Sequence, residues 1–262
     1  MKKMNKIKIG ITIFAVYFSQ NLLAQENVAI PVKPVKNNFM VELNFKPFGE
    51  NVISFNQLQL KYKTADNFAL RLGLAFDRNV LDQPGDDYDP SQQEKAAGKE
   101  NFTKFGILPG IEYHFLKNSK ISPYVGVEFS FFKQSVKSHY RDYTREYYAI
   151  HYTPVEIDID GATRAITQEY IQTTQGSYYY TTMSYLNRAY TSFGGNLLLG
   201  CDFYFMRHLY VGLEAGLSYN YTKNKKITID TSNQVNPQII PSNTASKFGF
   251  YYNSALRLGF WF

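Results

Sequence analysis

The chain has 262 residues, 44% of them hydrophobic and 17% aromatic, and a formal net charge of +6. This composition excludes an intrinsically disordered chain, which would have few aromatic residues and many charged ones. The one cysteine, Cys201, excludes an internal disulfide framework and a metal site built from several cysteines. The length suits one large β domain or two small domains.

Residues 1–24 have the pattern of a secretory signal peptide. Four lysines near the start precede an apolar run from Ile9 to Phe18, and Ala24 supplies a small residue at the expected cleavage site. The run is shorter than the roughly 20 residues that cross a bilayer as a helix; a buried first helix is the alternative. Removing four of the 28 Lys and Arg residues, and none of the 22 Asp and Glu residues, leaves a net charge of +2. The basic charge is therefore no argument for nucleic-acid binding.

After a loose periplasmic leader at 25–37, which holds Pro31 and Pro34, apolar residues alternate with small or polar ones. Within Phe68–Phe76 every second residue is apolar. Alternation of period two predicts β-strands. We expect eight such strands, at about 38–48, 52–63, 67–78, 102–116, 122–135, 189–206, 208–222 and 246–262.

The connections between these segments alternate in length. Short turns follow the second, fourth and sixth segments, whereas longer loops at about 79–101, 136–188 and 223–245 follow the third, fifth and seventh. Short turns on one side and long loops on the other are typical of outer-membrane barrels. The expected fold is therefore all-β: an eight-stranded antiparallel transmembrane β-barrel over 38–262, with short periplasmic turns and long extracellular loops.

A soluble β domain would alternate in the same way, but with its apolar face inside. The long apolar face of every segment, the small and charged residues opposite it, and the export signal favour the membrane barrel. A weak internal repeat, Tyr124-Val-Gly-Val-Glu128 and Tyr210-Val-Gly-Leu-Glu214, supports the count of hairpins.

Alternation also predicts which side chains point into the lumen. Side chains fill an eight-stranded barrel, and charges in such an interior must be paired or hydrogen-bonded. We expect a polar network centred on Arg71 and Arg257, with a proton or ion path as the functional alternative. Its predicted members are Glu42, Lys61, Arg71, Glu112, His114, Glu128, Asp202, Glu214 and Arg257.

His114 is a candidate catalytic residue because it shares a strand face with Glu112. A His–carboxylate pair can orient a base for a nucleophile. His114 lies near the short-turn end, however, and no serine has a compelling spacing to any histidine. The sequence therefore predicts neither an enzyme nor a cofactor.

The loop at 136–188 holds ten tyrosines, and Asp160-Gly161 between two alternating segments is a hairpin signal. We expect the fifth and sixth strands to extend outward as a ribbon with a tyrosine binding surface; an interfacial aromatic girdle is the alternative. The candidate binding residues are Tyr143, Tyr147, Tyr148, Tyr152, Tyr178, Tyr179 and Tyr180.

Two acidic stretches are candidate calcium sites. Glu156, Asp158 and Asp160 alternate on one strand face, and Asp86-Asp-Tyr-Asp89 lies in the 79–101 loop. Neither has the spacing of an EF-hand, so solvated acidic loops are favoured over a lipopolysaccharide-bridging Ca²⁺. No metal site is predicted.

The chain ends on Leu258-Gly-Phe260-Trp-Phe262, which resembles the terminal strand signal that the bacterial barrel-assembly machinery binds, with Phe260 and Phe262 as its key residues. Residues 38–262, except the large loops, resemble the OmpA/OmpX-like eight-stranded barrel superfamily. Val41-Glu-Leu-Asn-Phe-Lys-Pro-Phe-Gly49 and Ala69-Leu-Arg-Leu-Gly-Leu74 are similar to porin-family barrels of the Bacteroidetes, a Gram-negative group. The resemblance implies location in the cell outer membrane, after cleavage near Ala24.

The resulting functional hypothesis is a non-enzymatic outer-membrane protein whose extracellular loops serve surface binding or envelope integrity. An accessory subunit of an outer-membrane transport or secretion complex, with a protein partner there, is one alternative. A narrow porin is another. The expected partners are membrane lipid and lipopolysaccharide, with the barrel-assembly machinery during insertion, and no nucleic acid.

Overall fold

The computed structural model describes residues 33–45, 53–83, 97–116, 120–145, 152–173, 176–252 and 256–262. Every regular element in this part of the chain is a β-strand, and every strand pair is antiparallel. No helix among these residues is long and apolar enough to cross a membrane. The predicted signal peptide and most of the leader lie outside the described residues.

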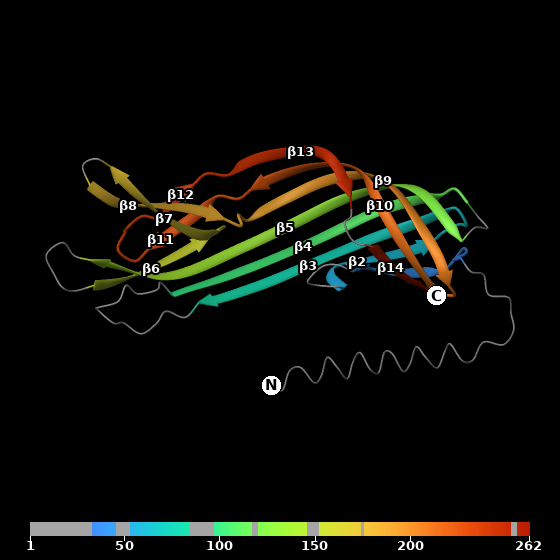
Figure 1. The fold of residues 1–262 in the computed structure, drawn as a ribbon, viewed down its shortest axis with the longest axis horizontal. Coiled ribbons are helices and arrows are strands. Elements are labelled where there is room, and N and C mark those ends of the chain that lie inside the picture. Colours follow the sequence, from blue (N-terminus) through green and yellow to red (C-terminus); the bar gives the residue numbers. More distant parts are fainter. Residues whose placement is uncertain are drawn as a thin grey trace, which may run out of the picture.

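Eight strands pair edge to edge into a closed ring, seen at the right of Figure 1. Strand β14 pairs with β1, which closes the ring; Val41 stands opposite Phe260, and Leu43 opposite Leu258. In order around the ring, the strands are β1 (Phe39–Phe45), β2 (Ile53–Lys63), β3 (Phe68–Gln83), β4 (Ala97–His114), β5 (Ile121–Arg145), β9 (Tyr190–Met206), β10 (Leu209–Asn224) and β14 (Leu256–Trp261).

The ring strands coincide with the eight segments expected from alternation, with differences in length. Strand β5 is 25 residues long, about twice the expected segment. The last segment consists of two strands, β13 (Asn243–Tyr252) and β14, which pair with the same strand β10 at successive heights.

A second tier of strands continues beyond the ring on the side of the long loops (Figure 1). Strand β5 pairs with β9 from Ile121 to Gln134, and then with β6 (Tyr152–Asp160) from Lys137 to Arg145. Strand β6 thus replaces β9 on the same edge of β5. Strand β11 (Ile227–Thr231) pairs with β6, and β12 (Gln238–Ile240) pairs with β11.

The expected hairpin turn at Asp160-Gly161 is wrong. Strand β6 pairs with β5 and β11, while β7 (Thr163–Thr173) and β8 (Gly176–Leu186) form a separate hairpin with each other. Gly161 instead turns the chain out of the sheet with a φ of 104°. The Asp-Gly pair does produce a sharp change of direction, because glycine adopts positive φ freely, but the strands on either side of it do not pair.

A row of backbone hydrogen bonds crosses the sheet where β6 gives way to β9. The N–H of Gly161 donates to the carbonyl of Val136 at 2.9 Å, that of Ala189 to Gly161 at 2.7 Å, and that of Lys225 to Ala189 at 2.8 Å. These bonds join β5, the turn after β6, the start of β9 and the end of β10 in one row. The backbone therefore stays hydrogen-bonded where the partner of β5 changes from β9 to β6.

Two small apolar clusters lie at opposite ends of the structure. One, at the short-turn end inside the ring, contains Met40, Ala69, Tyr204, Tyr210 and Trp261. The other, in the second tier, contains Tyr140, Ile159, Ala162, Ile227 and Ile229. Between them the interior of the ring is polar, and it carries the charged residues described below.

Replacing Gly161 with alanine should loosen the second tier and leave the ring intact. A Cβ there would lie 2.6 Å from the carbonyl oxygen of Lys226, at a backbone angle that side chains rarely adopt. We expect a cost of about 1–3 kcal/mol, measured as faster limited proteolysis within 146–188. The control is Gly249→Ala, because a Cβ at Gly249 would meet no atom within 4 Å. Equal cleavage of the two variants would contradict this account of the junction.

Candidate functional site

Each of the eight ring strands contributes a charged side chain to one cluster in the interior. All eight residues are at most 5% exposed. In ring order they are Glu42 on β1, Lys61 on β2, Arg71 on β3, Glu112 on β4, Glu128 on β5, Asp202 on β9, Glu214 on β10 and Arg257 on β14. Within this cluster five carboxylates face three cations, and a further buried cation, Lys63 of β2, lies nearer the short-turn end.

Arg71 binds three of the carboxylates. Its Nη1 lies 2.8 Å from Oε1 of Glu112 and 2.8 Å from Oε2 of Glu214, and its Nη2 lies 3.0 Å from Oε2 of Glu128. The planar guanidinium has donors enough for several acceptors, which suits it to the centre of such a cluster. Gly110 lies opposite Arg71 in the sheet and leaves space for this side chain: a Cβ there would approach Arg71 Cγ to 2.9 Å.

Lys61 and Arg257 bridge the remaining carboxylates. The Lys61 Nζ lies 2.7 Å from Glu42 Oε1 and 2.9 Å from Glu112 Oε1. Arg257 places Nη1 3.0 Å from Glu42 Oε2 and Nη2 3.0 Å from Asp202 Oδ1. Its Nη1 is also 3.4 Å from Oε2 of Glu214, a carboxylate that Arg71 binds too.

The contacts form a closed circuit in which positive and negative groups alternate. In order, its members are Glu42, Lys61, Glu112, Arg71, Glu214, Arg257 and Glu42 again. Asp202 joins it through Arg257, and Glu128 through Arg71. Such pairing offsets much of the cost of removing charges from water.

Two tyrosines that are not among the predicted lumen residues complete the cluster. The Tyr124 hydroxyl donates to Glu214 Oε2 at 2.6 Å, and the Tyr210 hydroxyl donates to Glu42 Oε1 at 2.7 Å. The Tyr124 ring also lies 5.2 Å from Lys61 Nζ, within the range of a cation–π contact.

Glycines make room for both tyrosine rings. Tyr124 stands opposite Gly200 and Tyr210 opposite Gly259, and a Cβ at either glycine would lie 2.1 Å from a ring carbon. The Tyr-Val-Gly-x-Glu repeat was the signal that could have found these rings, because alternation puts its tyrosine and glutamate on the same face.

His114 also lies in the interior, and its partners include a serine that the sequence did not reveal. The His114 Nδ1 is 2.9 Å from Ser122 Oγ, and its Nε2 is 3.4 Å from Glu112 Oε2. Sequence spacing did not indicate this pair, because Ser122 lies near the start of the next strand, β5, and comes close to His114 only when β4 and β5 pair. Ser122 is fully buried, and Glu112 already binds Lys61 and Arg71, so this row is part of the polar cluster.

The end of the leader contacts the short-turn end of the ring. The buried Lys33 ammonium donates to the carbonyl of Leu116, and the N–H of Asn37 donates to Lys63 O at 2.8 Å. Burial lowers the pKa of Lys33, while Asp202 and Asp66 act in the opposite direction. Residues 33–37 therefore pack against the ring.

On the terminal strand, the N–H of Phe262 donates to the carbonyl of Phe39 at 3.0 Å.

The predicted tyrosine surface lies only partly within the described residues. Tyr147 and Tyr148 are outside them. Strand pairing places Tyr143 opposite Pro154 and Tyr152 opposite Arg145, while Tyr178, Tyr179 and Tyr180 follow one another on β8, in the separate hairpin. The side chains of all seven are outside the described part of the structure, so the binding surface stays a prediction.

A described tyrosine, Tyr140, fixes the base of the β7–β8 hairpin. Its hydroxyl donates to Glu100 Oε1 at 2.7 Å and accepts from the N–H of Arg164 at 2.9 Å. The Arg164 guanidinium lies 4.4 Å from the Tyr140 ring centre. Burial raises the pKa of Tyr140.

The acidic residues of β6 pair with basic ones of β5. His139 Nδ1 lies 2.8 Å from Asp158 Oδ1, His139 Nε2 lies 3.0 Å from Glu156 Oε2, and Arg141 Nε lies 2.6 Å from Glu156 Oε1. In the described ranges, no group of three or more His, Cys, Asp or Glu residues is placed to hold a metal ion. The second acidic stretch, 86–89, is outside those ranges.

No family model matches the chain, and no curated protein matches it. Among solved structures, the N-terminal β-barrel domain of Pseudomonas aeruginosa OprF aligns with 87% of this chain and 100% of its own, at 12% identity and a TM-score of 0.30. The β domain of the Bordetella autotransporter BrkA aligns with 87% of this chain and 99% of its own, at 7% identity and a TM-score of 0.18.

Replacing Arg71 with leucine should strongly destabilise the ring. Glu112, Glu128 and Glu214 would each lose a buried cation, and breaking a buried pair costs about 3–5 kcal/mol. The measurement is the urea midpoint of the protein folded in detergent micelles. Arg78→Leu, an exposed position on the same strand, is the matched control and should unfold near the wild-type midpoint. The circuit would lose its assigned role if both variants unfolded at the same urea concentration.

Replacing Tyr140 with phenylalanine should free the β7–β8 hairpin while leaving the ring unchanged. The variant loses the hydroxyl that joins Glu100 to the Arg164 N–H, at a cost of about 1 kcal/mol for each bond. Hydrogen exchange should become faster at Thr163–Thr173 and stay constant in β9 and β10. Tyr219→Phe, on the exposed side of β10, serves as the control. Unchanged exchange in β7 would show that the hydroxyl does not hold the hairpin.

Proposed function

We propose that this chain is an integral outer-membrane β-barrel with a filled lumen, non-enzymatic, whose second tier faces outward and serves surface binding or envelope integrity. The observation that carries the proposal is the inverted polarity of the ring. Eight charged side chains are buried inside it, while large apolar side chains such as Phe129, Leu199 and Leu213 are about 60% exposed on its outer face, at 65%, 62% and 58%.

This polarity suits lipid and not water. A soluble sheet buries its apolar face and exposes its polar one, and large apolar patches on monomers are rare. In a bilayer, an apolar outer surface is solvated by acyl chains, and a closed ring satisfies the backbone hydrogen bonds within the sheet. The aromatic residues of the short-turn rim, including Phe39, Tyr113, Phe205 and Phe262, suit an interfacial girdle.

The filled interior favours a structural or binding role over conduction. The charge circuit and the two tyrosine rings occupy the lumen of the ring, so a narrow porin has little support. The long β5 supports an outward role for the second tier: about 9–11 residues cross the membrane, and β5 has 25.

The further parts of the proposal come from the sequence. They are export by a signal peptide cleaved near Ala24, membership of the OmpA/OmpX-like superfamily in a Bacteroidetes-type cell, and insertion through the barrel-assembly machinery with Phe260 and Phe262 as the signal. Lipid and lipopolysaccharide are the surrounding partners.

The test is fractionation of cells followed by reconstitution of the purified protein. We expect the protein in the outer-membrane fraction, with gel mobility that changes on heating, and no steady large conductance in planar bilayers. Recovery of a folded soluble protein would refute the membrane proposal. A steady large conductance would refute the filled lumen alone. A stoichiometric protein partner after mild-detergent purification would instead favour the accessory subunit of a larger complex.

A further inference from the structure

An apolar groove of about 500 Å³ runs along the outer face of the ring beside the short-turn rim. Val125 and Val127 of β5 form its floor. Ile111 and Tyr113 of β4 line one side, and Leu197 and Leu199 of β9 line the other. Almost all of its surface is apolar, and it begins near the rim, where Phe68 and Tyr113 stand at the ends of their strands.

The groove exists because the outward side chains of β5 are short at this height. Two valines alternate with Gly126, whereas the strands on both sides present longer outward side chains. Farther along β5, the next outward residue is Phe129, which is large and 65% exposed. The hollow therefore follows β5 between two raised walls.

The backbone around the groove offers nothing to a pairing strand. Strand β5 is hydrogen-bonded to β4 on one edge and to β9 on the other throughout this stretch, and β9 is bonded to β10. Addition of a partner's β-strand needs an open edge. The occupant must accordingly be apolar, narrow and free of any need for hydrogen bonds within the groove.

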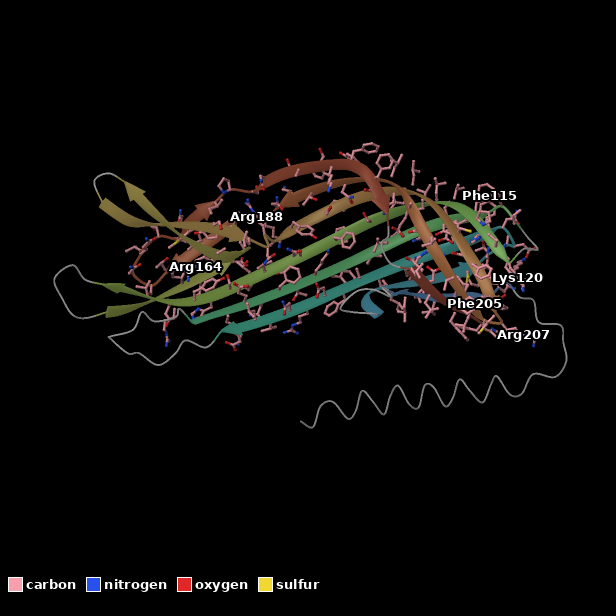
Figure 2. All side chains as sticks on the ribbon, in the orientation of Figure 1. Phe115, Lys120, Arg164, Arg188, Phe205 and Arg207 are labelled. Carbon is pink, nitrogen blue, oxygen red and sulfur yellow. The ribbon has the colours of Figure 1, made fainter. Side chains whose placement is uncertain are left out.

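The rim next to the groove is basic. Among the described residues of the short-turn end, the exposed charged side chains are Lys36, Asp66, Lys120 and Arg207. Figure 2 shows Lys120 and Arg207 at this end together with Phe115 and Phe205. Lys120 directly precedes β5, and Val125 lies five residues farther along, which is about 17 Å on an extended strand. A cation thus stands at the rim, in line with the strand that forms the floor of the groove.

We propose that the groove binds one acyl chain of a phospholipid with an anionic headgroup, and that Lys120 faces its phosphate. The inference rests on the proposed function, because the groove meets lipid only if the ring spans a membrane. The short-turn end is the expected periplasmic side, so the ligand belongs to the inner leaflet of the outer membrane. The apolar lining accommodates the acyl chain, and the basic rim favours an anionic headgroup.

The test begins with native mass spectrometry of the protein purified in mild detergent. Wild type should retain one phospholipid. Val127→Trp fills the groove and should lower the retained fraction several-fold. Val211→Trp is the matched control, because Val211 lies outside the groove and alternates with the buried Tyr210 and Gly212 on β10. It should retain lipid as wild type does.

The headgroup is tested in nanodiscs of phosphatidylcholine and phosphatidylglycerol in equal amounts. Wild type should enrich phosphatidylglycerol after transfer to detergent, and Lys120→Glu should retain a chain but lose that preference. Heat-dependent gel mobility establishes that every variant is folded.

The inference would be overturned if the two tryptophan variants retained phospholipid equally. It would also be overturned if the bound molecule proved to be lipopolysaccharide or a protein. A folded outer-membrane barrel without retained phospholipid defeats this inference alone. A protein that does not reach the outer membrane defeats the proposed function as well, so the two failures are distinguishable.

Discussion

The structure depends on the pairing of eight charges inside a closed ring of strands. The circuit joins residues as far apart in sequence as Glu42 and Arg257, which are 215 positions apart. Each strand contributes one member, so the circuit forms only when all eight strands are in place. Burying a charge is costly unless it is paired, so a sheet that slipped by one residue would turn its charged side chain out of the lumen and leave its partners uncompensated. The circuit thus opposes register errors in every strand.

The same arrangement decides where a function can reside. Tyr124 and Tyr210 lie across Gly200 and Gly259 and bond to the carboxylates inside the ring. Even the Ser122–His114–Glu112 row, whose residue types suit catalysis, is enclosed within this packing. What remains accessible is the outer face, where apolar side chains meet their surroundings, and the second tier.

The second tier forms where one ring strand extends beyond its neighbour and a new strand takes that neighbour's place. Strand β5 continues beyond β9, and β6 takes the place of β9 on the same edge. The row of hydrogen bonds through Gly161, Ala189 and Lys225 joins the two levels, and a separate apolar cluster around Ile159 and Ile227 stabilises the upper one. The tier therefore has its own core, which allows its loops to vary without disturbing the charge circuit.

The sequence alone determined the strands and the faces of their side chains, because alternation is a local property of an extended chain. Alternation alone places Arg71 and Arg257 on the inner face. Only the tertiary structure decided which carboxylates each cation binds, since that depends on the order of strands around the ring. It likewise decided that Asp160-Gly161 joins two separate sheets instead of one hairpin. The local signal specified a turn. Beyond the end of β9, however, the edge of β5 is free, and β6 pairs with that edge, while β7 pairs with β8.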